Sequence, residues 1–306
     1  MMKIMTAILA CESGKLDDVI TINESINSAY GSGIYIKVGE ELTLRDLVYG
    51  LMLRSGNDAA SAIADYVGGD IDKFVEMMNN KAKEIGMKNS KFNNPSGLDD
   101  NGGNLSTAYD MALLMSYAMK NKEFKTITGT KIYKLKTNMN YYSWINKNKL
   151  LNSYKYTTGG KTGFTDVAKR TLVTTATKDN LNLVAVTLND GNDFIDHKNL
   201  FEYGFSKYKN YSILESGIIN IYDENYYGKS EFYINNSFSY PLLETEQSSI
   251  KLKFLIEKKE DIKSNEEIGN VEVFIGDKKI YEDILFIREK GNDKAGFFTK
   301  LRSLFK

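Results

Sequence analysis

The sequence predicts a mixed α+β domain over residues 1–210, a small β-rich domain over 211–289 and a basic amphipathic tail over 290–306. Apolar residues recur at helical spacing in the first part of the chain, and β-branched residues gather in short runs further on. Hydrophobic residues make up 42% of the chain and charged residues 26%, which argues against wholesale disorder and against a bundle of membrane helices. A chain of 306 residues is long enough for two domains.

The helical region begins after Thr43. Apolar residues on one side of the chain predict a helix there that stops at the polar, glycine-containing break 54–57. A second helix is predicted over about residues 58–67 and a third over about 71–85, which Gly86 closes. The first domain is therefore mainly helical over its middle part.

A further helix start and a β-hairpin complete the first domain. Thr107 and Asp110 form a pair that resembles a capping box, and apolar residues follow at helical spacing. Residues 171–177 and 181–188 are rich in β-branched side chains and flank a short polar turn, which predicts an antiparallel hairpin. Helices bracketed by antiparallel strands are typical of an α+β domain.

The last third of the chain has a different pattern. Short alternating runs, such as 250–254 and 271–274, are separated by polar turns and predict a small all-β domain. Between 294 and 306, aromatic and aliphatic residues alternate with basic ones. Such a tail either lies on a membrane surface or frays in water, and the sequence leaves both interpretations open.

The net charge and the single cysteine and histidine limit the functions that the chain can have. Forty basic residues balance forty acidic ones, and we find no basic stripe interleaved with aromatic residues, so we expect no nucleic-acid partner. Cys11 is the single cysteine, which excludes internal disulfides and thiolate metal clusters and predicts a small buried side chain. His197 is the single histidine and lies late in the chain, which argues against a Ser-His-Asp triad and against sites with several imidazoles.

The N-terminal end carries no export signal that we can identify. The chain has no apolar run of about 18 residues, and no basic, apolar and small-residue signal sequence opens it. Residues 1–10 already form a dense apolar run without a capping residue, so a buried helix begins in mid-element. Taken literally, this beginning predicts a cytoplasmic protein.

Three short elements carry candidate chemistry. They occur in this order: Lys3 at the start of an apolar helix, the Ser-Gly-Asn triplet 55–57 at a helix break, and the Lys-Thr-Gly triplet 161–163 at the entry to a strand. Each alone is typical of an ordinary turn, cap or strand edge. Their order and context favour a shared site.

With these elements, residues 1–210 resemble the serine D-alanyl-D-alanine carboxypeptidases, the low-molecular-mass penicillin-binding proteins. The similarity extends over the segments 3–7, 39–40, 55–60, 94–98, 106–108 and 161–166. Residues 217–289 are similar to the family's β-rich C-terminal domain, and the terminal stretch is similar to its membrane anchor. The resemblance implies a β-lactamase/transpeptidase-like fold whose N-terminal strands are missing here, so we expect exposed apolar surface and poor solubility.

The family's first motif is Ser-x-x-Lys. Its serine would fall immediately before Met1, with Lys3 as the lysine, and either a start codon assigned inside the gene or an N-terminal deletion accounts for this. The chain as given is therefore expected to lack the nucleophile and to be incapable of acylation. Other serines with a lysine three residues on follow the Lys-Thr-Gly triplet, in the wrong order, and we assign no role to them: Ser206, Ser248 and Ser303.

The mechanism that the resemblance implies is acyl transfer. A serine attacks the penultimate carbonyl of a peptidoglycan stem peptide, the terminal D-alanine leaves, and water hydrolyses the acyl-enzyme. Lys3 would be the base, because burial and the second ammonium of Lys161 make it lose its proton more readily. Ser55 would relay a proton to the leaving amine, and Asn57 would hold the substrate amide.

The Lys-Thr-Gly strand would bind the end of the substrate. Lys161 and Thr162 would hold its terminal carboxylate, while Gly163 lets backbone and substrate approach closely. The N–H group of Phe164 would be one oxyanion donor. Arg170 is either a further carboxylate contact or a solvated strand-edge residue. This chemistry requires no metal and no organic cofactor.

The implied partners are peptidoglycan stem peptides and β-lactam antibiotics, with a membrane contact through 294–306. The implied location is the cell envelope outside the cytoplasm, or the cytoplasm if Met1 is the true start. A pseudoenzyme that binds wall peptide or β-lactam without acylation is the alternative from another class. A class A β-lactamase shares the fold, but 55–57 reads Ser-Gly-Asn in place of Ser-Asp-Asn, and we find no deacylating glutamate loop between Asn57 and Lys161.

Overall fold

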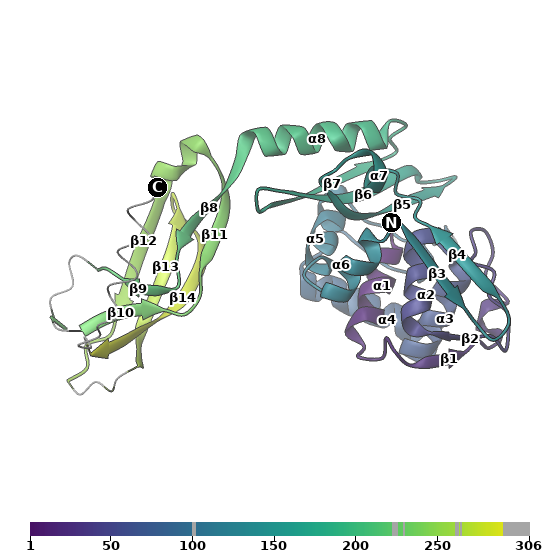
Figure 1. The fold of residues 1–306 in the computed structure, drawn as a ribbon, viewed down its shortest axis with the longest axis horizontal. Coiled ribbons are helices and arrows are strands. Elements are labelled where there is room, and N and C mark those ends of the chain that lie inside the picture. The colour runs from purple at the N-terminus through teal and green to yellow at the C-terminus, as the bar shows by residue number, and fades with distance from the viewer. Residues whose placement is uncertain (100–101, 222–225, 229, 261–262, 264, 290–306) are drawn as a thin grey trace. The chain divides into compact units, whose positions relative to one another are not determined.

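The chain forms two compact units that divide between Ser206 and Lys207 (Figure 1). The tail predicted over 290–306 lies outside the described residues. The structure is a computed structural model that describes residues 1–99, 102–221, 226–228, 230–260, 263 and 265–289.

The first unit is built from helices and antiparallel strands. Its helices are α1 (Lys3–Glu12), α2 (Leu44–Tyr49), α3 (Asn57–Gly68), α4 (Ile71–Ile85), α5 (Ala108–Ala118), α6 (Lys122–Gly129), α7 (Leu150–Ser153) and α8 (Asp193–Lys207), the last of which reaches the boundary. Its strands are β1 (Val19–Thr21), β2 (Glu41–Thr43), β3 (Ile132–Lys136), β4 (Tyr141–Ile145), β5 (Thr157–Thr165), β6 (Lys169–Lys178) and β7 (Leu181–Leu188). They form the pairs β1–β2 and β3–β4 and a three-stranded antiparallel sheet in the order β5-β6-β7.

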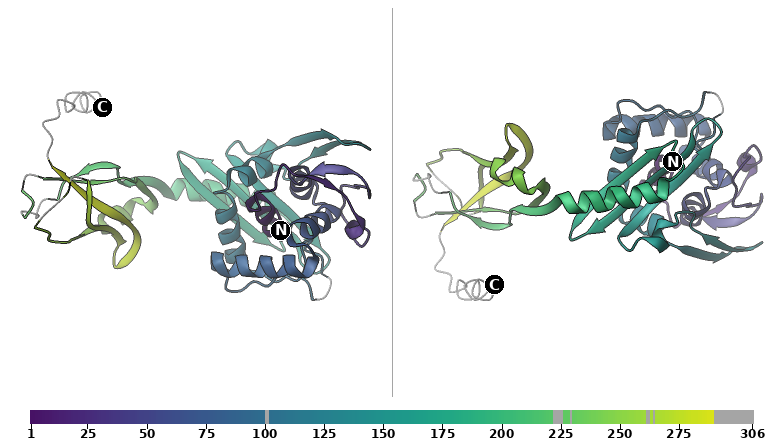
Figure 2. Two further views of the ribbon diagram at one scale, coloured as in Figure 1. Left: turned by 90° about the horizontal axis from the view of Figure 1, so that it is seen from below. Right: turned by 90° about the horizontal axis from the view of Figure 1, so that it is seen from above.

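The three-stranded sheet lies between two helical layers. Helices α7 and α8 lie on one side of it and α5 and α6 on the other (Figure 1). The view from above in Figure 2 shows α8 running across the sheet. Leu150 of α7 and Phe201 of α8 pack with Ala176 of β6 in one apolar cluster. Val173 of β6 instead belongs to the main core that surrounds α1.

Helix α1 lies inside the first unit. All of its residues from Lys3 to Cys11 are buried, as the unbroken apolar run predicts. Burial, with the nearby Glu123 carboxylate as the next cause, raises the pKa of the Cys11 thiol to about 12. Cys11 is therefore the small buried side chain that the sequence predicts.

The predicted helix ends have clear local causes. Thr43 forms a capping box at the start of α2, in which its side chain accepts a hydrogen bond from the N–H of Asp46. The chain then continues into a π-helical turn over residues 50–54 and ends in the left-handed conformation at Ser55, with φ 66°. Gly86 closes α4 with φ 87°, as predicted.

The predicted hairpin is formed by β6 and β7. Asp179 and Asn180, with φ angles of 50° and 60°, make its two-residue turn. Both central residues of a type I′ turn need a positive φ, which Asp and Asn tolerate better than most residues. The hairpin brings β6 between its neighbours, next to the strand that carries the Lys-Thr-Gly triplet.

The second unit is the small all-β domain that the sequence predicts. Strands β12, β13, β14, β10 and β9 form a five-stranded antiparallel sheet in that order, and β8 pairs with β11. Within the described ranges, no helix is both long and apolar enough to cross a membrane. The strands are β8 (Tyr208–Leu214), β9 (Gly217–Ile219), β10 (Ser230–Ile234), β11 (Phe238–Leu243), β12 (Ile250–Ile256), β13 (Glu266–Ile275) and β14 (Lys278–Glu289).

Candidate active site

The Ser-Gly-Asn triplet lies where the chain passes from the π-helical turn into α3. Ser55 ends the turn, Gly56 precedes the helix and Asn57 is its first residue. A Cβ atom at Gly56 would lie 2.8 Å from the Asp58 Oδ1 atom, so a larger residue would push that carboxylate aside. The tight turn holds the Ser55 side chain at the wall of a cleft while Asn57 is buried beside it.

The side chain of Lys3 contacts that of Asn57. The Lys3 Nζ atom donates a hydrogen bond to the Asn57 Oδ1 atom, 2.6 Å away, and another to the carbonyl oxygen of Ser96. Asn57 Nδ2 in turn donates to the carbonyl oxygen of Tyr30 at 2.6 Å. These contacts fix the carboxamide in one orientation, with its oxygen toward the amine of Lys3.

Lys3 is poised to lose its proton near neutral pH. The pKa of Lys3 is lowered to about 7, first by burial and then by the charge of Lys147, while Asp58 opposes the shift. Only 6% of the residue is exposed. An amine with this pKa is present in both protonation states at neutral pH, which is what a general base requires.

The Lys-Thr-Gly triplet lies on β5, where strand pairing with β6 holds it. Lys161 is 1% exposed, and its Nζ atom donates to the carbonyl oxygen of Thr162 at 2.9 Å. Burial, followed by the charges of Lys3 and Lys147, holds the pKa of Lys161 well below its ordinary value. The two buried amines therefore belong to one electrostatic cluster.

Gly163 lies where β5, β6 and the start of α1 meet. A Cβ atom there would lie 2.5 Å from the Thr171 Oγ1 atom and 2.7 Å from the backbone nitrogen of Met1. Real Cβ atoms essentially never come this close to other atoms, so only glycine fits without a shift. The same contact places the start of the chain directly beside the strand.

Two adjoining hollows form the site. The main cleft has a volume of about 780 Å³ and is lined by Ser55, Thr162, Gly163 and Phe164 among others. A smaller side pocket of about 90 Å³ is lined by Lys3 and also by Ser55, Gly163 and Phe164. The structure thus brings together the residues that the sequence analysis nominates, although Lys161 and Asn57 are buried and are not among the residues that line the two hollows.

Arg170 lies on the wall of the main cleft, and its side chain is 48% exposed, as in the strand-edge interpretation. Its Nη2 atom is paired with the Asp193 Oδ1 atom at 2.6 Å, and the Asp193 side chain is only 5% exposed. Both residues line the main cleft. The pair joins the start of α8 to β6, while about half of the Arg170 side chain stays accessible to solvent.

Sequence reasoning missed two contributors to the site. Lys147 lines the main cleft and acts on the pKa values of both Lys3 and Lys161. Asp58 accepts hydrogen bonds from the backbone N–H groups of Ile34 and Tyr35, which holds the loop beside Asn57. For Lys147, the available signal in the sequence was the local excess of lysine around it. For Asp58, the signal was its position directly after the Ser-Gly-Asn triplet.

Comparisons with known proteins agree with this geometry. The profile of the peptidase S11 family, described as D-alanyl-D-alanine carboxypeptidase, matches residues 1–192. A profile described as penicillin-binding protein 5, C-terminal domain, matches residues 208–292. The chain is 32% identical over 322 residues to the D-alanyl-D-alanine carboxypeptidase DacF of Bacillus subtilis, which covers 99% of this chain and 81% of that relative. It is 30% identical to DacD of Salmonella typhimurium, over 94% of this chain and 77% of the relative.

Solved structures give the same result. The chain is similar to penicillin binding protein 5 from Haemophilus influenzae, with a TM-score of 0.73 and 27% identity over 94% of this chain and 88% of the other. It is also similar to the carboxypeptidase DacD from Francisella tularensis, with a TM-score of 0.67 and 26% identity over 94% and 86% of the two chains. Since one profile covers more than half of the chain and a carboxypeptidase aligns with nearly all of it, the chain belongs to the peptidase S11 family of serine D-alanyl-D-alanine carboxypeptidases.

Proposed function

We propose that the cleft binds the D-alanyl-D-alanine end of a peptidoglycan stem peptide and supports its hydrolysis by acyl transfer to a serine. The observation that carries this proposal is the buried amine of Lys3, with a pKa of about 7, hydrogen-bonded to Asn57 beside the cleft that Ser55 and β5 line. Members of the family act on D-alanyl-D-alanine peptides of peptidoglycan, bind β-lactams and work at the cell envelope outside the cytoplasm.

Substrate binding falls to β5 and to Asn57. Lys161 and Thr162 would hold the terminal carboxylate of the peptide, and Gly163 leaves room for the substrate backbone. Each half of the Asn57 carboxamide makes one hydrogen bond within the protein, and a carboxamide has two acceptor and two donor positions. One acceptor and one donor therefore remain for a substrate amide.

The chemistry proceeds through an acyl-enzyme. A serine oxygen attacks the carbonyl carbon of the penultimate D-alanine, and its proton passes to the neutral amine of Lys3. The C–N bond then breaks, and the leaving amine takes a proton through the Ser55 hydroxyl. The N–H group of Phe164 would stabilise the oxyanion. Water then attacks the ester, which releases the shortened peptide and returns the proton to the serine.

In the proposed mechanism, the attacking serine is the first residue of a Ser-x-x-Lys motif whose lysine is Lys3. Among the 306 residues, no serine stands three positions before Lys3. The backbone nitrogen of Met1 lies against Gly163, so a residue joined to it would enter the side pocket beside Lys3. We therefore propose that a serine joined to Met1 would stand within reach of the Lys3 amine.

A binding function without catalysis is the second candidate. It would use the groups that we propose for recognition, Asn57 and the Lys-Thr-Gly triplet on β5, without a nucleophile. A binder would retain the affinity of the cleft for D-alanyl-D-alanine peptides, and binding groups without a nucleophile cannot form a covalent adduct.

One experiment separates these possibilities. The 306-residue chain, a serine-extended chain with one serine directly ahead of Met1, and an alanine-extended control are each incubated with benzylpenicillin and examined by intact-protein mass spectrometry. We expect a stoichiometric adduct on the serine-extended chain alone. An adduct on the 306-residue chain would overturn the placement of the nucleophile, and no adduct on any of the three would favour the binder.

A further inference from the structure

The whole chain has no net charge, but one segment of it has a strong excess of lysine. Residues 124–165 contain eight lysines and no aspartate, glutamate or arginine, although the full chain has equal numbers of basic and acidic residues. This excess corrects the expectation that the chain carries no basic stripe among aromatic residues. The eight are Lys125, Lys131, Lys134, Lys136, Lys147, Lys149, Lys155 and Lys161.

Part of this segment forms a single exposed face. The strands β3 and β4 pair antiparallel, and side chains on alternate residues point to the same face. On the outer face, Lys136 pairs with Tyr141, Lys134 with Ser143 and Ile132 with Ile145, and all six residues are exposed. The inner face carries Trp144, which packs into the main core.

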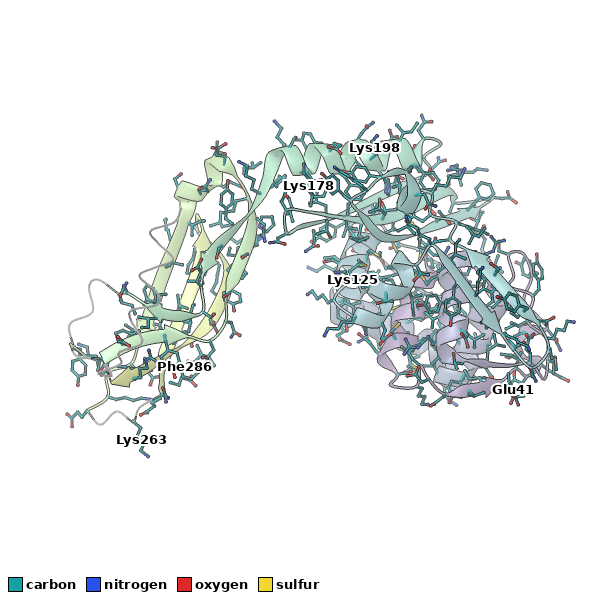
Figure 3. All side chains as sticks on the ribbon, viewed as in Figure 1. Glu41, Lys125, Lys178, Lys198, Lys263 and Phe286 are labelled. Atoms are coloured by element: carbon teal, nitrogen blue, oxygen red, sulfur yellow. The ribbon has the colours of Figure 1, made fainter. Side chains whose placement is uncertain are left out.

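This face continues into the active-site cleft. Ile145 at its end lines the main cleft, as do Lys147 and Lys149, which follow β4 in the chain. Ile145 follows Tyr141 by four positions, about 13 Å along a strand. Lys125 does not belong to the face, since it lies on α6 at the far side of the unit from the hairpin (Figure 3). We call the surface made by Lys134, Lys136, Tyr141, Ile145, Lys147 and Lys149 the lysine track.

The lysines of the track are not neutralised by the protein. Within the part of the chain that the structure describes, no ion pair involves a lysine of the track, whereas Lys81 and Lys279 are each paired with two carboxylates. Among them stand exposed apolar side chains, with Tyr141 68% exposed and Ile145 57% exposed. Free cations beside flat apolar surface suit a ligand that has both carboxylates and sugar rings.

We propose that the lysine track binds the peptidoglycan polymer next to the stem peptide in the cleft, with carboxylates of neighbouring stem peptides on its lysines and sugar rings against Tyr141 and Ile145. This inference rests on the proposed function, because the polymer is the material to which the peptide in the cleft is attached. Continuity of the track with the main cleft is what favours this occupant over other polyanions. A nucleic acid or a phosphate polymer has no reason to lead into a peptide cleft.

The test measures binding to the polymer and to a short peptide separately. The 306-residue chain, the variant Lys134→Glu/Lys136→Glu and the control Lys83→Glu/Lys88→Glu are sedimented with purified peptidoglycan freed of phosphate polymers. Lys83 and Lys88 are exposed, lie at and just after the end of α4, and give the same change in net charge. The same proteins are titrated with a soluble D-alanyl-D-alanine peptide that is too short to reach the hairpin.

We expect polymer binding to be about tenfold weaker for the track variant than for the control, since two lysine contacts are lost and replaced by repulsion between carboxylates. It should also weaken for the unchanged chain between about 0.05 M and about 0.5 M salt. Binding of the short peptide should be equal in all three proteins. Equal sedimentation of the track variant and the control would overturn the proposal, and so would efficient competition by polyphosphate or double-stranded DNA.

The outcome also separates this inference from the proposed function. If the short peptide fails to bind but the polymer still binds through the track, the proposed function fails and the track remains. If the short peptide binds and the track variant keeps full polymer binding, the track fails and the proposed function remains.

Discussion

The amine of Lys3 and the side-chain oxygen of Asn57 are joined by a hydrogen bond of 2.6 Å, which links the first turn of α1 to the first turn of α3. Both residues are buried, so the bond is shielded from water and holds each partner firmly. The proposed base and the proposed substrate-amide holder are thus one connected unit. A change in the charge of the Lys3 amine therefore alters the hydrogen bond that the Asn57 oxygen accepts.

The first prediction concerns the pH dependence of acylation. Lys3 can accept a proton only when neutral, and its pKa is lowered to about 7. The rate at which the serine-extended chain is acylated by a fluorescent penicillin should therefore rise with pH through about 7 and level off above it. Lys3→Arg, which keeps the charge but cannot lose its proton, should abolish the reaction. A rate that is constant from pH 5.5 to 8.5 would contradict the role of Lys3.

The second prediction assigns a positioning role to Asp58. Its carboxylate accepts hydrogen bonds from the N–H groups of Ile34 and Tyr35, at 3.0 Å and 2.7 Å, and its charge opposes the fall in the Lys3 pKa. Asp58→Asn should lower stability by about 1–3 kcal/mol, because a buried N–H group loses its acceptor. It should also move the acid limb of the acylation profile to lower pH.

A matched control tests whether this effect is specific. Asp72 occupies the first turn of α4 as Asp58 occupies the first turn of α3, but Asp72 is exposed. Asp72→Asn should leave the pH profile unchanged and reduce stability only slightly. If Asp58→Asn and Asp72→Asn give the same pH profile, the charge of Asp58 does not act on Lys3.

Sequence reasoning was most successful where local chemistry determines structure. Capping at Thr107, whose side chain accepts a hydrogen bond from the N–H of Asp110, the stop at Gly86 and the turn at Asp179 and Asn180 each follow from residue types that favour one backbone conformation. The order of the three short elements was enough to nominate the site. The family resemblance then supplied the roles.

The rest of the site depends on contacts between distant parts of the chain. No local pattern indicates that the Asp58 carboxylate reaches Ile34, or that Arg170 meets Asp193, because both contacts form only when separate elements pack. The lysine track was not predicted from the sequence for another reason. Whole-chain charge averages over all faces, whereas a binding surface depends on which residues strand pairing places side by side.

The third prediction concerns the space at Gly163. A Cβ atom there would lie 2.5 Å from the Thr171 Oγ1 atom, so Gly163→Ala must push β5 away from β6 or from the start of α1. A displacement of the reacting groups by about 1 Å costs on the order of 100-fold in rate. We therefore expect acylation of the serine-extended Gly163→Ala chain to fall by about that factor. Gly191→Ala is the control, since a Cβ atom at Gly191 would meet nothing within 4 Å. Equal acylation of the two variants would show that the fit at Gly163 is not needed.

The fourth prediction uses the single histidine as a reporter of how α8 is held. His197 is fully buried, with Nδ1 2.6 Å from the Thr174 hydroxyl and Nε2 3.1 Å from the Thr187 hydroxyl. Burial lowers the pKa of His197 to about 4, although the nearby carboxylates of Asp193 and Asp190 oppose the shift. The neutral ring therefore joins α8 to both β6 and β7.

The sign of the resulting pH effect follows from the two pKa values. The unfolded chain takes up a proton on His197 near pH 6.5, whereas the folded chain does so only near pH 4. Between these values the unfolded state binds more protons, so the free energy of unfolding falls as pH drops from about 6.5 to about 4, by about 3 kcal/mol at most. Urea unfolding of the unchanged chain and of His197→Gln at several pH values measures this term as the difference between the two slopes. The glutamine variant should be less stable at pH 7 and should lose this part of the pH dependence. Parallel curves for the two proteins would mean that His197 takes up its proton equally readily when folded.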